Sequence, residues 1–322
     1  MNILVTGGAG FIGSHIVEAL LKIDEVEKIN ILDNLSTGYL KNIEPFLHDP
    51  RVKFYQEDIR DLEACVKAAE GMDAVCHQAA LGSVPRSIKD PITTHNVNVN
   101  GFVNILEACR KNMVSRIVYA SSSSVYGDLP DSPKVEAKTG QILSPYAATK
   151  LTNEIYARAY AITYGMQIAG FRYFNVFGAR QDPNGAYAAV IPLFFKAAFR
   201  NESPSINGDG SITRDFTYIN NVVKANLAGM FKLSIPGRHE VFNIACGETT
   251  SLNKLWELIA GITGTSAKPV YKPVRQGDIL QSLADINKAS TFLEYSDLIK
   301  IEQGLSYTAD WYKNESIKLI TT

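Results

Sequence analysis

A tyrosine and a lysine stand four residues apart in the middle of the chain, at Tyr146 and Lys150. Four residues make slightly more than one helical turn, so both side chains leave the same face of a helix and the ammonium can lie close to the phenol. A free tyrosine has a pKa of about 10, and lowering it to about 7 requires about 4 kcal/mol. One cation about 4 to 5 Å away, at an effective dielectric constant of about 20, supplies on the order of 3 to 4 kcal/mol. The pair predicts a phenolate base at neutral pH. The alternative is that the tyrosine is an ordinary packed aromatic and the lysine is a solvated charge.

The start of the chain supplies a partner for such a base. Gly7, Gly10 and Gly13 follow a strand that begins at residue 2, and they open a helix. The first glycine permits a tight turn, the second lets the backbone approach a pyrophosphate, and the third lets helix and strand pack closely, while the helix N-terminus faces the phosphate charge. The turn predicts a bound dinucleotide, whose positively charged nicotinamide ring would lower the pKa of the phenol further.

Two carboxylates at strand ends indicate which dinucleotide binds. Asp33 lies 20 positions after Gly13. A carboxylate there accepts hydrogen bonds from the adenosine ribose hydroxyls and repels a 2′-phosphate, which favours NAD over NADP; the alternative is a helix or turn cap. Asp58 ends the next strand, where it bonds the adenine amino group or caps the following helix. Residues 77–80 end the fourth strand with two alanines and leave space for the pyrophosphate and ribose.

Composition excludes several classes of function. The chain has 322 residues with 46% hydrophobic content, enough for one large domain or a large domain with a smaller one. Its 32 basic and 33 acidic residues form no basic run, which argues against a nucleic acid or a membrane surface as partner. The four cysteines lack paired spacing and are expected to be buried thiols, and the five histidines lack metal-ligand spacing, so no metal is expected. The chain enters a strand at once and residues 186–199 contain Pro192 and Lys196, which predicts a soluble cytoplasmic protein.

Short apolar runs alternate with helical patterns through the first half of the chain. Strands are predicted at 3–6, 28–33, 52–57, 74–78, 116–121 and 167–175, and helices at 12–21, 62–70, 96–111 and 146–164. This alternation is typical of βαβ units and predicts an α/β fold with a doubly wound parallel Rossmann sheet of six or seven strands.

The residue types change after Phe177. Gly, Pro, Asn and Asp become frequent there, which is typical of loops around short elements. A helix at 219–233 and a strand at 241–245 are expected to rejoin the main sheet. The chain is therefore predicted to form an NAD-binding Rossmann domain from 1–178 plus about 215–246, and a smaller, discontinuous α/β substrate lobe from about 179–214 and 247–322.

Eight motifs in order resemble the nucleotide-sugar epimerase branch of the extended short-chain dehydrogenase/reductases, over nearly the whole chain. They are residues 7–13, 33–38, 58–61, 77–80, 98–101, 121–127, the Tyr146 and Lys150 pair, and 172–178. The resemblance implies a tightly held NAD. The residues it assigns to the cofactor are Gly7, Gly10, Phe11, Ile12, Gly13, Asp33, Asn34, Ser36, Thr37, Gly38, Asp58, Ile59, Gln78, Ala79, Ala80, Asn98, Ser121, Tyr146, Lys150, Tyr173 and Val176.

The same resemblance implies a reaction. Ser122, four residues before Tyr126, would bridge the sugar hydroxyl and Tyr146, with Asn98 ordering the backbone or a water behind Lys150. Relatives that dehydrate a sugar carry a carboxyl pair at the next two positions, and decarboxylating relatives keep a glutamate there. This chain has serines at both positions and so lacks the carboxyl groups that elimination requires. The reaction that remains is oxidation of the sugar at C4. Return of the hydride to the other face of the 4-keto sugar gives the C4 epimer, with Tyr146, Lys150 and Ser122 as catalytic residues.

Further segments resemble UDP-N-acetylglucosamine 4-epimerases of polysaccharide synthesis, at 82–88, 180–192, 207–210 with 214–216, and 275–278 with 282–285. Arg214 and Arg275 would clamp the diphosphate bidentately; alternatively they are surface arginines paired with Asp215 and Asp278. The implied substrate contacts are Ser83, Arg86, Ser87, Ser122, Ser123, Ser124, Asn175, Ala189, Val190, Asn207, Arg214, Arg275, Asp278 and Ser282.

Ser282 takes the position that in the family lies beside the 2-substituent of the sugar. Serine leaves room for an acetamido group where a large aromatic would not, so interconversion of UDP-GlcNAc and UDP-GalNAc is expected, with weaker activity on UDP-Glc and UDP-Gal. A uronic acid substrate is an alternative, because Arg86 or Lys89 would suit a carboxylate at C6 of the sugar. A nucleotide-sugar reductase, a dehydratase and a non-catalytic NAD sensor are competing interpretations, and a sensor would be expected to lose the Tyr146 and Lys150 pair.

The predicted helices at 96–111 and 146–164 carry an apolar stripe. Its residues are Val103, Leu106, Leu151, Ile155, Tyr156 and Tyr160. In the family, such a pair of helices joins its mate in a four-helix bundle, so a homodimer is expected. Packing against the protein's own sheet explains part of the same stripe.

Overall fold

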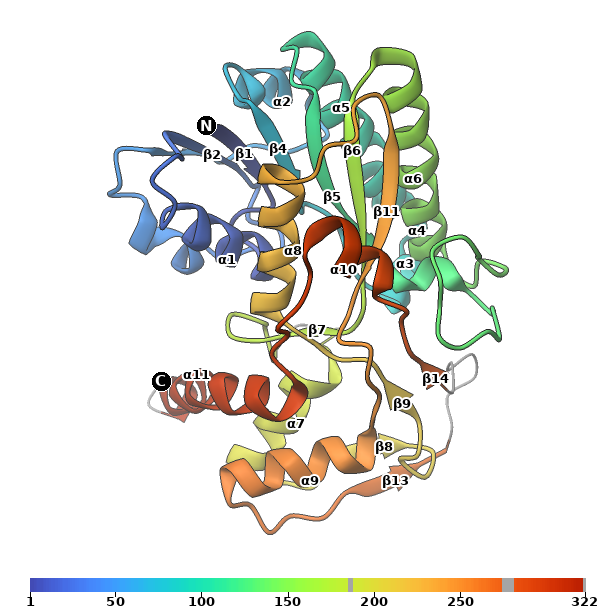
Figure 1. Ribbon diagram of the computed structural model, residues 1–322. Coiled ribbons are helices and arrows are strands. Elements are labelled where there is room, and N and C mark those ends of the chain that lie inside the picture. The colour runs from blue at the N-terminus through green and yellow to red at the C-terminus, as the bar shows by residue number, and fades with distance from the viewer. Residues whose placement is uncertain (185–187, 274–280, 321–322) are drawn as a thin grey trace.

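A seven-stranded parallel sheet forms the centre of the computed structural model, which describes the chain except for residues 185–187, 274–280 and 321–322 (Figure 1). The strand order is β11-β6-β5-β4-β1-β2-β3, and every pair runs parallel. The bounds are β1 (Asn2–Thr6), β2 (Lys28–Leu32), β3 (Val52–Tyr55), β4 (Ala74–His77), β5 (Arg116–Ser122), β6 (Gln167–Tyr173) and β11 (His239–Ile244). The predicted doubly wound sheet is confirmed, including the late strand that rejoins it.

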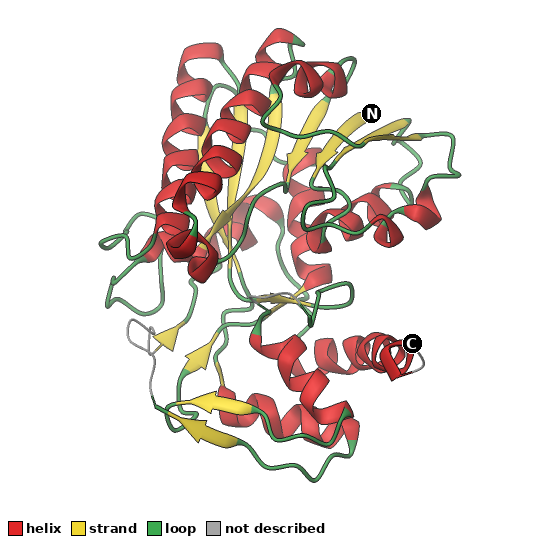
Figure 2. Ribbon diagram, turned by 180° about the vertical axis from the view of Figure 1, so that it is seen from behind, coloured by secondary structure: helices red, strands yellow, loops and turns green. Residues whose placement is uncertain are grey.

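Helices cover both faces of this sheet (Figures 1 and 2). One face carries α1 (Phe11–Leu20) and α8 (Ile219–Phe231), and the other carries α2 (Leu62–Ala69), α5 (Gly101–Lys111) and α6 (Pro145–Tyr164). Successive strand side chains point to opposite faces. Ile3 and Val118 accordingly belong to one buried cluster, and Leu4 and Ile117 to the other.

Short elements connect the strands to these helices. They are the 3-10 turns Leu40–Asn42 and Glu44–Phe46, α3 (Val84–Lys89), α4 (Pro91–His95), a π-helical turn at Asn96–Asn100, and the 3-10 helix η4 (Ser123–Tyr126). The single helix predicted at 96–111 is thus a π-helical turn followed by α5.

A smaller group of elements lies below the carboxyl ends of the large sheet (Figure 1). Its helices are α7 (Val190–Phe199), α9 (Leu252–Thr263) and α11 (Ile301–Ile320), which pack on one another. Its strands are β8 (Ser205–Asn207), β9 (Thr213–Arg214), β12 (Thr250–Ser251), β13 (Val270–Lys272) and β14 (Gln281–Ser282), paired as β12-β9-β14 and β13-β8. A two-stranded pair, β7 (Val176–Phe177) with β10 (Thr217–Tyr218), lies between the two groups.

One helix of the late chain returns to the large sheet. α10 (Asn287–Leu293) packs against β11 and α8, although the predicted substrate lobe includes this stretch. The exact division into two domains stays a prediction. In the described part of the chain, no helix combines the length and the apolar character that crossing a bilayer requires. The four cysteines are buried and unpaired, as predicted.

Asp215 joins the two groups of elements. Its side chain is fully buried, and its carboxylate accepts hydrogen bonds from the backbone N–H groups of Cys246 (2.8 Å), Gly247 (3.0 Å) and Ala284 (3.3 Å). Burial raises the pKa of this carboxyl to about 6. The alternative in which Asp215 pairs with Arg214 is wrong, because among the described residues this carboxylate binds backbone groups instead of a guanidinium.

Candidate active site

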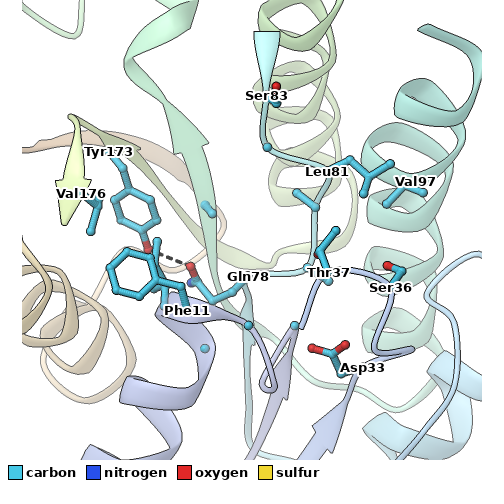
Figure 3. Close-up of a pocket in the computed structure, with 18 of the residues that line it drawn as sticks. Phe11, Asp33, Ser36, Thr37, Gln78, Leu81, Ser83, Val97, Tyr173 and Val176 are labelled. Carbon is cyan, nitrogen blue, oxygen red and sulfur yellow. Dashed lines mark hydrogen bonds between the residues drawn. The ribbon is translucent and has the colours of Figure 1, made fainter. Parts of the chain in front are cut away.

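A cleft of about 540 Å³ opens at the carboxyl ends of the central strands, where the strand order reverses between β1 and β4. In doubly wound sheets, ligands bind at this point because the loops diverge there. All the predicted cofactor residues line the cleft except Gly38 and Asn98. The structure therefore brings together residues from seven of the eight motifs around one cavity (Figure 3).

The glycine turn has the shape that a pyrophosphate requires. Gly7 has a φ of +66°, and a Cβ there would lie 2.6 Å from the backbone nitrogen of Ala79. A Cβ on Gly13 would lie 2.1 Å from the carbonyl oxygen of Gly7. Gly10 precedes α1 and provides no side-chain cap, so N–H groups of the first turn stay available for an anion. Gly38 lies behind this turn, where a Cβ would lie 2.8 Å from the carbonyl carbon of Ala9.

The carboxylate of Asp33 binds the glycine turn and also lines the cleft. Its carboxylate accepts hydrogen bonds from the N–H groups of Ala9 (2.9 Å) and Leu35 (2.8 Å), and it is 8% exposed. Burial raises its pKa, and these backbone bonds oppose the rise. The predicted turn-capping role is therefore present. The carboxylate also faces the cleft near Ser36 and Thr37 (Figure 3), which fits NAD and disfavours a 2′-phosphate, while its contact with the ribose stays a prediction.

Asp58 is held at the cleft by two neighbours. Its carboxylate accepts hydrogen bonds from Arg60 (2.7 Å) and Asn34 (2.7 Å), and the bond from Arg60 is the main reason that its pKa falls to about 2. Asp61 caps α2 by accepting from the N–H groups of Glu63 and Ala64. The alternative in which Asp58 caps that helix is wrong, because the chain turns for three more residues before α2 begins.

Tyr146 and Lys150 lie in the first turns of α6, whose N-cap is Ser144. The Lys150 ammonium donates a 2.7 Å hydrogen bond to the carbonyl oxygen of Ala120 on β5. Burial lowers the pKa of Lys150 to about 8, and Glu154 opposes this change. Burial raises the pKa of Tyr146, and a hydrogen bond with Ser122 opposes the rise. Without a bound cofactor, burial is therefore the larger influence on the pKa of the phenol, and the phenolate predicted for Lys150 together with the nicotinamide ring stays a prediction.

Ser122 ends β5 beside the phenol. Its hydroxyl accepts a hydrogen bond from the N–H of Ser124 (3.1 Å) and so caps η4, and it also lowers the pKa of Tyr146. Ser123 and Ser124 belong to η4 and do not line the cleft as far as the structure describes it. The Ser124 hydroxyl is buried without a hydrogen-bond partner among the described residues.

Asn98 lies in the π-helical turn, outside the cleft wall. Its amide binds both backbone groups of Leu81, at 2.8 Å to the N–H and 3.2 Å to the carbonyl oxygen, and donates to the Thr149 hydroxyl at 3.1 Å. Leu81 lines the cleft. Of the two roles predicted for Asn98, the ordering of backbone is therefore the one found.

The floor of the cleft contains a closed group of hydrogen bonds. The Tyr173 hydroxyl donates to the side-chain oxygen of Gln78 (3.1 Å), as the dashed line in Figure 3 shows. Asn226, on α8, donates to the Tyr173 hydroxyl (2.8 Å) and accepts from the Gln78 amide (3.0 Å). Tyr173 and Gln78 were predicted, but Asn226 comes from a helix 53 residues beyond Tyr173, which no local motif indicates.

The predicted substrate residues divide into three groups. Ser83, Ser122, Asn175 and Ala189 line the cleft. Those placed away from the described cleft wall are Arg86 and Ser87 on α3, Ser123 and Ser124 on η4, Val190 at the start of α7, Asn207 on β8, Arg214 on β9 and Ser282 on β14. Arg214 and Ser282 are paired in register in the small sheet. Arg275 and Asp278 lie outside the described residues.

A contact between two walls of the cleft was not predicted. The Tyr39 hydroxyl donates a 2.6 Å hydrogen bond to the Asp182 carboxylate, and both residues line the cleft. Arg180, on the same loop as Asp182, forms a 2.6 Å ion pair with Glu18 of α1 and stacks over the ring of Phe46. Tyr39 directly follows the motif at 33–38, so an aromatic with a polar tip at the end of that motif was a usable signal.

Comparisons with known proteins agree with this site. The sequence matches the NAD dependent epimerase/dehydratase family over residues 3–245. A putative UDP-glucose 4-epimerase of Methanocaldococcus jannaschii is 40% identical over 316 residues, which cover 98% of this chain and 99% of that protein. The structure of a UDP-N-acetylglucosamine 4-epimerase from Methanobrevibacter ruminantium M1, in complex with UDP-N-acetylmuramic acid, has a TM-score of 0.91 and 38% identity, covering 98% of both chains.

A third similar protein shows the cofactor. The structure of UDP-glucuronic acid 4-epimerase from Bacillus cereus, in complex with UDP-glucuronic acid and NAD, has a TM-score of 0.89 and 33% identity, covering 98% of this chain and 100% of that one. The glycine turn, the carboxylate at Asp33 and the Tyr146 and Lys150 pair fit the same cofactor. The chain therefore belongs to the NAD-dependent epimerase/dehydratase family, as a nucleotide-sugar 4-epimerase of the extended short-chain dehydrogenase/reductases.

Proposed function

We propose that this enzyme interconverts UDP-N-acetylglucosamine and UDP-N-acetylgalactosamine through a 4-keto intermediate, and supplies polysaccharide synthesis in the cytoplasm. The observation that carries the reaction type is that Ser122 and Tyr146 line the cleft together, where Ser122 lowers the pKa of the phenol, and that serines follow at positions 123 and 124. A dehydratase or decarboxylase needs carboxyl groups at those positions, and this chain has hydroxyls.

In this mechanism the chain's own residues move and hold protons. The Ser122 hydroxyl accepts the hydrogen bond of the C4 hydroxyl and passes its proton to Tyr146, while Lys150 stabilises the phenolate that receives it. When bound, NAD would supply the acceptor and donor of the C4 hydride, and the positive charge of its oxidised ring would favour the ionised phenol. When the keto sugar presents its other face, Tyr146 gives the proton back to the C4 oxygen. The sum is inversion at C4 with no net redox change.

The position of Ser282 supports the acetamido sugar. Ser282 is the register partner of Arg214 on neighbouring parallel strands. A guanidinium suits a diphosphate, so a substrate whose diphosphate contacts Arg214 has its sugar within reach of the adjacent strand. A serine side chain there leaves room for a 2-acetamido group. The relative from Methanobrevibacter ruminantium, named for UDP-N-acetylglucosamine, supports the same choice.

Two other sugars remain as second candidates. The relatives named for glucose and glucuronic acid favour UDP-glucose or a uronic acid form. Arg86 and Lys89 lie on α3, whose N-cap Ser83 lines the cleft, and either cation suits a C6 carboxylate. The UDP-GlcNAc uronic acid form combines both features.

We also propose a homodimer through α5 and α6. On α6, Ile155 is 62% exposed and Ile162 is 73% exposed, and Ile92 is 73% exposed on α4, which packs against α6. Leu106, predicted for the same interface, is fully buried in the protein's own core, because its side of α5 faces the sheet. Light scattering of the purified protein tests this: an Ile155→Glu, Ile162→Glu double variant is expected to be monomeric.

A side-by-side assay tests the reaction and the sugar. The purified protein is denatured and its released NAD is quantified, and UDP-GlcNAc, UDP-Glc and UDP-GlcNAc uronic acid are assayed in parallel with products separated by C4 configuration. We expect bound NAD and fastest turnover of UDP-GlcNAc. No bound NAD together with no product from any of the three would remove the epimerase assignment, and preference for either other sugar would remove the acetamido assignment alone.

A further inference from the structure

Three side chains of α6, each one turn apart, fasten this helix to the end of β5. Tyr146 lies with Ser122 at the cleft, where Ser122 lowers the pKa of the phenol, and Lys150 donates to the carbonyl oxygen of Ala120. One turn further along, the carboxylate of Glu154 accepts a 2.6 Å hydrogen bond from the Ser121 hydroxyl. Three consecutive residues of β5 thus hold three consecutive turns of the helix, and only the third of these contacts has no role in the reaction as described so far.

Glu154 also forms an ion pair deep in the protein. Its carboxylate accepts two hydrogen bonds from Arg172 of β6, at 2.9 Å from Nε and 2.8 Å from Nη2. The side chains of Glu154 and Arg172 are 8% and 3% exposed. Arg172 also donates to the carbonyl oxygen of Glu136 (3.1 Å) and stacks on the Tyr126 ring. A bidentate geometry fixes the carboxylate in one orientation.

A buried ion pair is a poor way to gain stability. Removing two charges from water is costly, and well-packed apolar residues of the same volume are often as stable or more stable. A carboxylate one helical turn from a buried ammonium instead favours the charged form of that ammonium.

We propose that Glu154 is a positioning residue for Lys150, whose carboxylate keeps the neighbouring ammonium charged and directed at β5 while Tyr146 works. This inference rests on the proposed role of Lys150 in catalysis. It assigns to Arg172 and Ser121 the task of holding the carboxylate in place.

The other ionisable groups near this pair do not replace Glu154. Lys150 faces Tyr146 on its own helix and His77 of β4, which burial keeps neutral with a pKa of about 3. Glu154 faces Arg172, and also Tyr119 of β5, His239 of β11 and Arg158 of α6. Among these described groups, Glu154 is the anion that acts on Lys150.

The direction of the effect follows from the charge of Lys150. The ammonium is charged below its pKa of about 8 and loses its proton as pH rises through that value. Glu154 opposes the lowering by burial, so its removal lowers the pKa of Lys150 further. An opposite charge within about 4–6 Å shifts a pKa by about 1 to 3 units. The pH at which kcat falls on the alkaline side of its profile, its alkaline limb, therefore depends in part on Glu154.

The test is the pH profile of kcat in Glu154→Gln. We expect the alkaline limb to move down by about one pH unit or more, so that kcat at pH 8.5 falls about tenfold relative to kcat at pH 6.5. Glu154→Asp keeps the charge and is expected to return the limb towards its original position. Glu107→Gln is the matched control, because Glu107 is a helix glutamate bound to Arg110 and Tyr160 away from the cleft.

Glu154→Gln leaves Arg172 buried without its full partner and could unfold the protein. The double variant Glu154→Gln, Arg172→Met removes both charges and is expected to show the same shift in the limb. Melting temperature and NAD content verify that each variant is folded and loaded. An unshifted limb in a folded, loaded Glu154→Gln or double variant would overturn the proposal.

Lys150→Met separates this proposal from the reaction on which it rests. If the wild-type protein epimerises no nucleotide sugar, or if Lys150→Met is fully active, the proposed function fails. If the wild-type protein is active and Lys150→Met is inactive, but the limb does not depend on Glu154, then only the role of Glu154 fails.

Discussion

The hydroxyl of Tyr39 donates a 2.6 Å hydrogen bond to the carboxylate of Asp182, across 143 positions of the chain. Tyr39 follows the motif that lines the ribose end of the cleft, and Asp182 lies on the loop after β7. An epimerase must keep its cofactor between the two halves of the reaction, since NADH that leaves takes the hydride with it. This bond joins two walls of the cleft, and we expect it to slow the exit of the cofactor.

Tyr39→Phe is therefore expected to release NAD faster. Loss of one partly exposed hydrogen bond is worth about 1 kcal/mol, which corresponds to about a fivefold higher dissociation rate. The NAD that stays with the protein during dialysis measures this. Tyr271→Phe is the matched control, because the Tyr271 hydroxyl binds Asn253 (3.0 Å) away from the described cleft. Equal retention in both variants would show that the contact does not hold the cofactor.

Tyr146→Phe is expected to abolish epimerisation while NAD stays bound. The substitution removes the oxygen that exchanges the proton but keeps the ring that packs at the cleft, so kcat should fall at least about 1000-fold. Tyr160→Phe, on the same helix with its hydroxyl on Glu107, is expected to retain activity. Turnover in Tyr146→Phe comparable to this control would exclude the phenol from the mechanism.

Ser282→Tyr is expected to separate the two kinds of sugar. A tyrosine side chain fills the space proposed for the acetamido group, so kcat/KM for UDP-GlcNAc should fall about 100-fold while UDP-Glc turnover persists. Ser211→Tyr, at an exposed serine before β9, controls for a general effect on the small sheet. Unchanged preference in Ser282→Tyr would refute the steric explanation.

Three histidines, of which His77 is buried and His15 and His239 are half-buried, predict a loss of stability in mild acid. Burial lowers the pKa of His15 and of His239 to about 4, and that of His77 to about 3. The unfolded chain binds protons on these side chains near pH 6.5, whereas the folded protein does not. The stability that each neutral ring retains is thus complete above about pH 6.5 and is lost as pH falls towards about 4, on the order of 3 kcal/mol per group.

Chemical denaturation at pH 7 and pH 5 measures this loss. His239→Gln keeps a polar partner for the Tyr119 hydroxyl, which the ring nitrogen binds at 2.9 Å. It is expected to reduce the pH dependence, whereas His48→Gln, at a position away from the buried core, should not. An identical acid dependence in both variants would assign the destabilisation to other groups.

The sequence predicted well what its local patterns encode. The strands, the glycine turn and the Tyr146 and Lys150 pair depend on neighbours a few residues away, and each lies where its motif places it. The burial that raises the pKa of Tyr146 depends on how many atoms surround the phenol, which residue spacing does not reveal. The register of Arg214 with Ser282 joins segments far apart in the chain, and only the folded chain shows it.

Asp215 has a consequence for protein engineering. Its carboxylate binds N–H groups on two later passages of the chain, at Cys246 and Gly247 and again at Ala284. A chimera that imports the segments proposed to recognise the sugar from another epimerase therefore has to keep this carboxylate and the three N–H groups that bond to it in the same relative positions. Segments grafted singly would leave buried backbone groups unpaired, at about 1–3 kcal/mol for each. The segments proposed to recognise the sugar are therefore expected to be exchangeable only as a set.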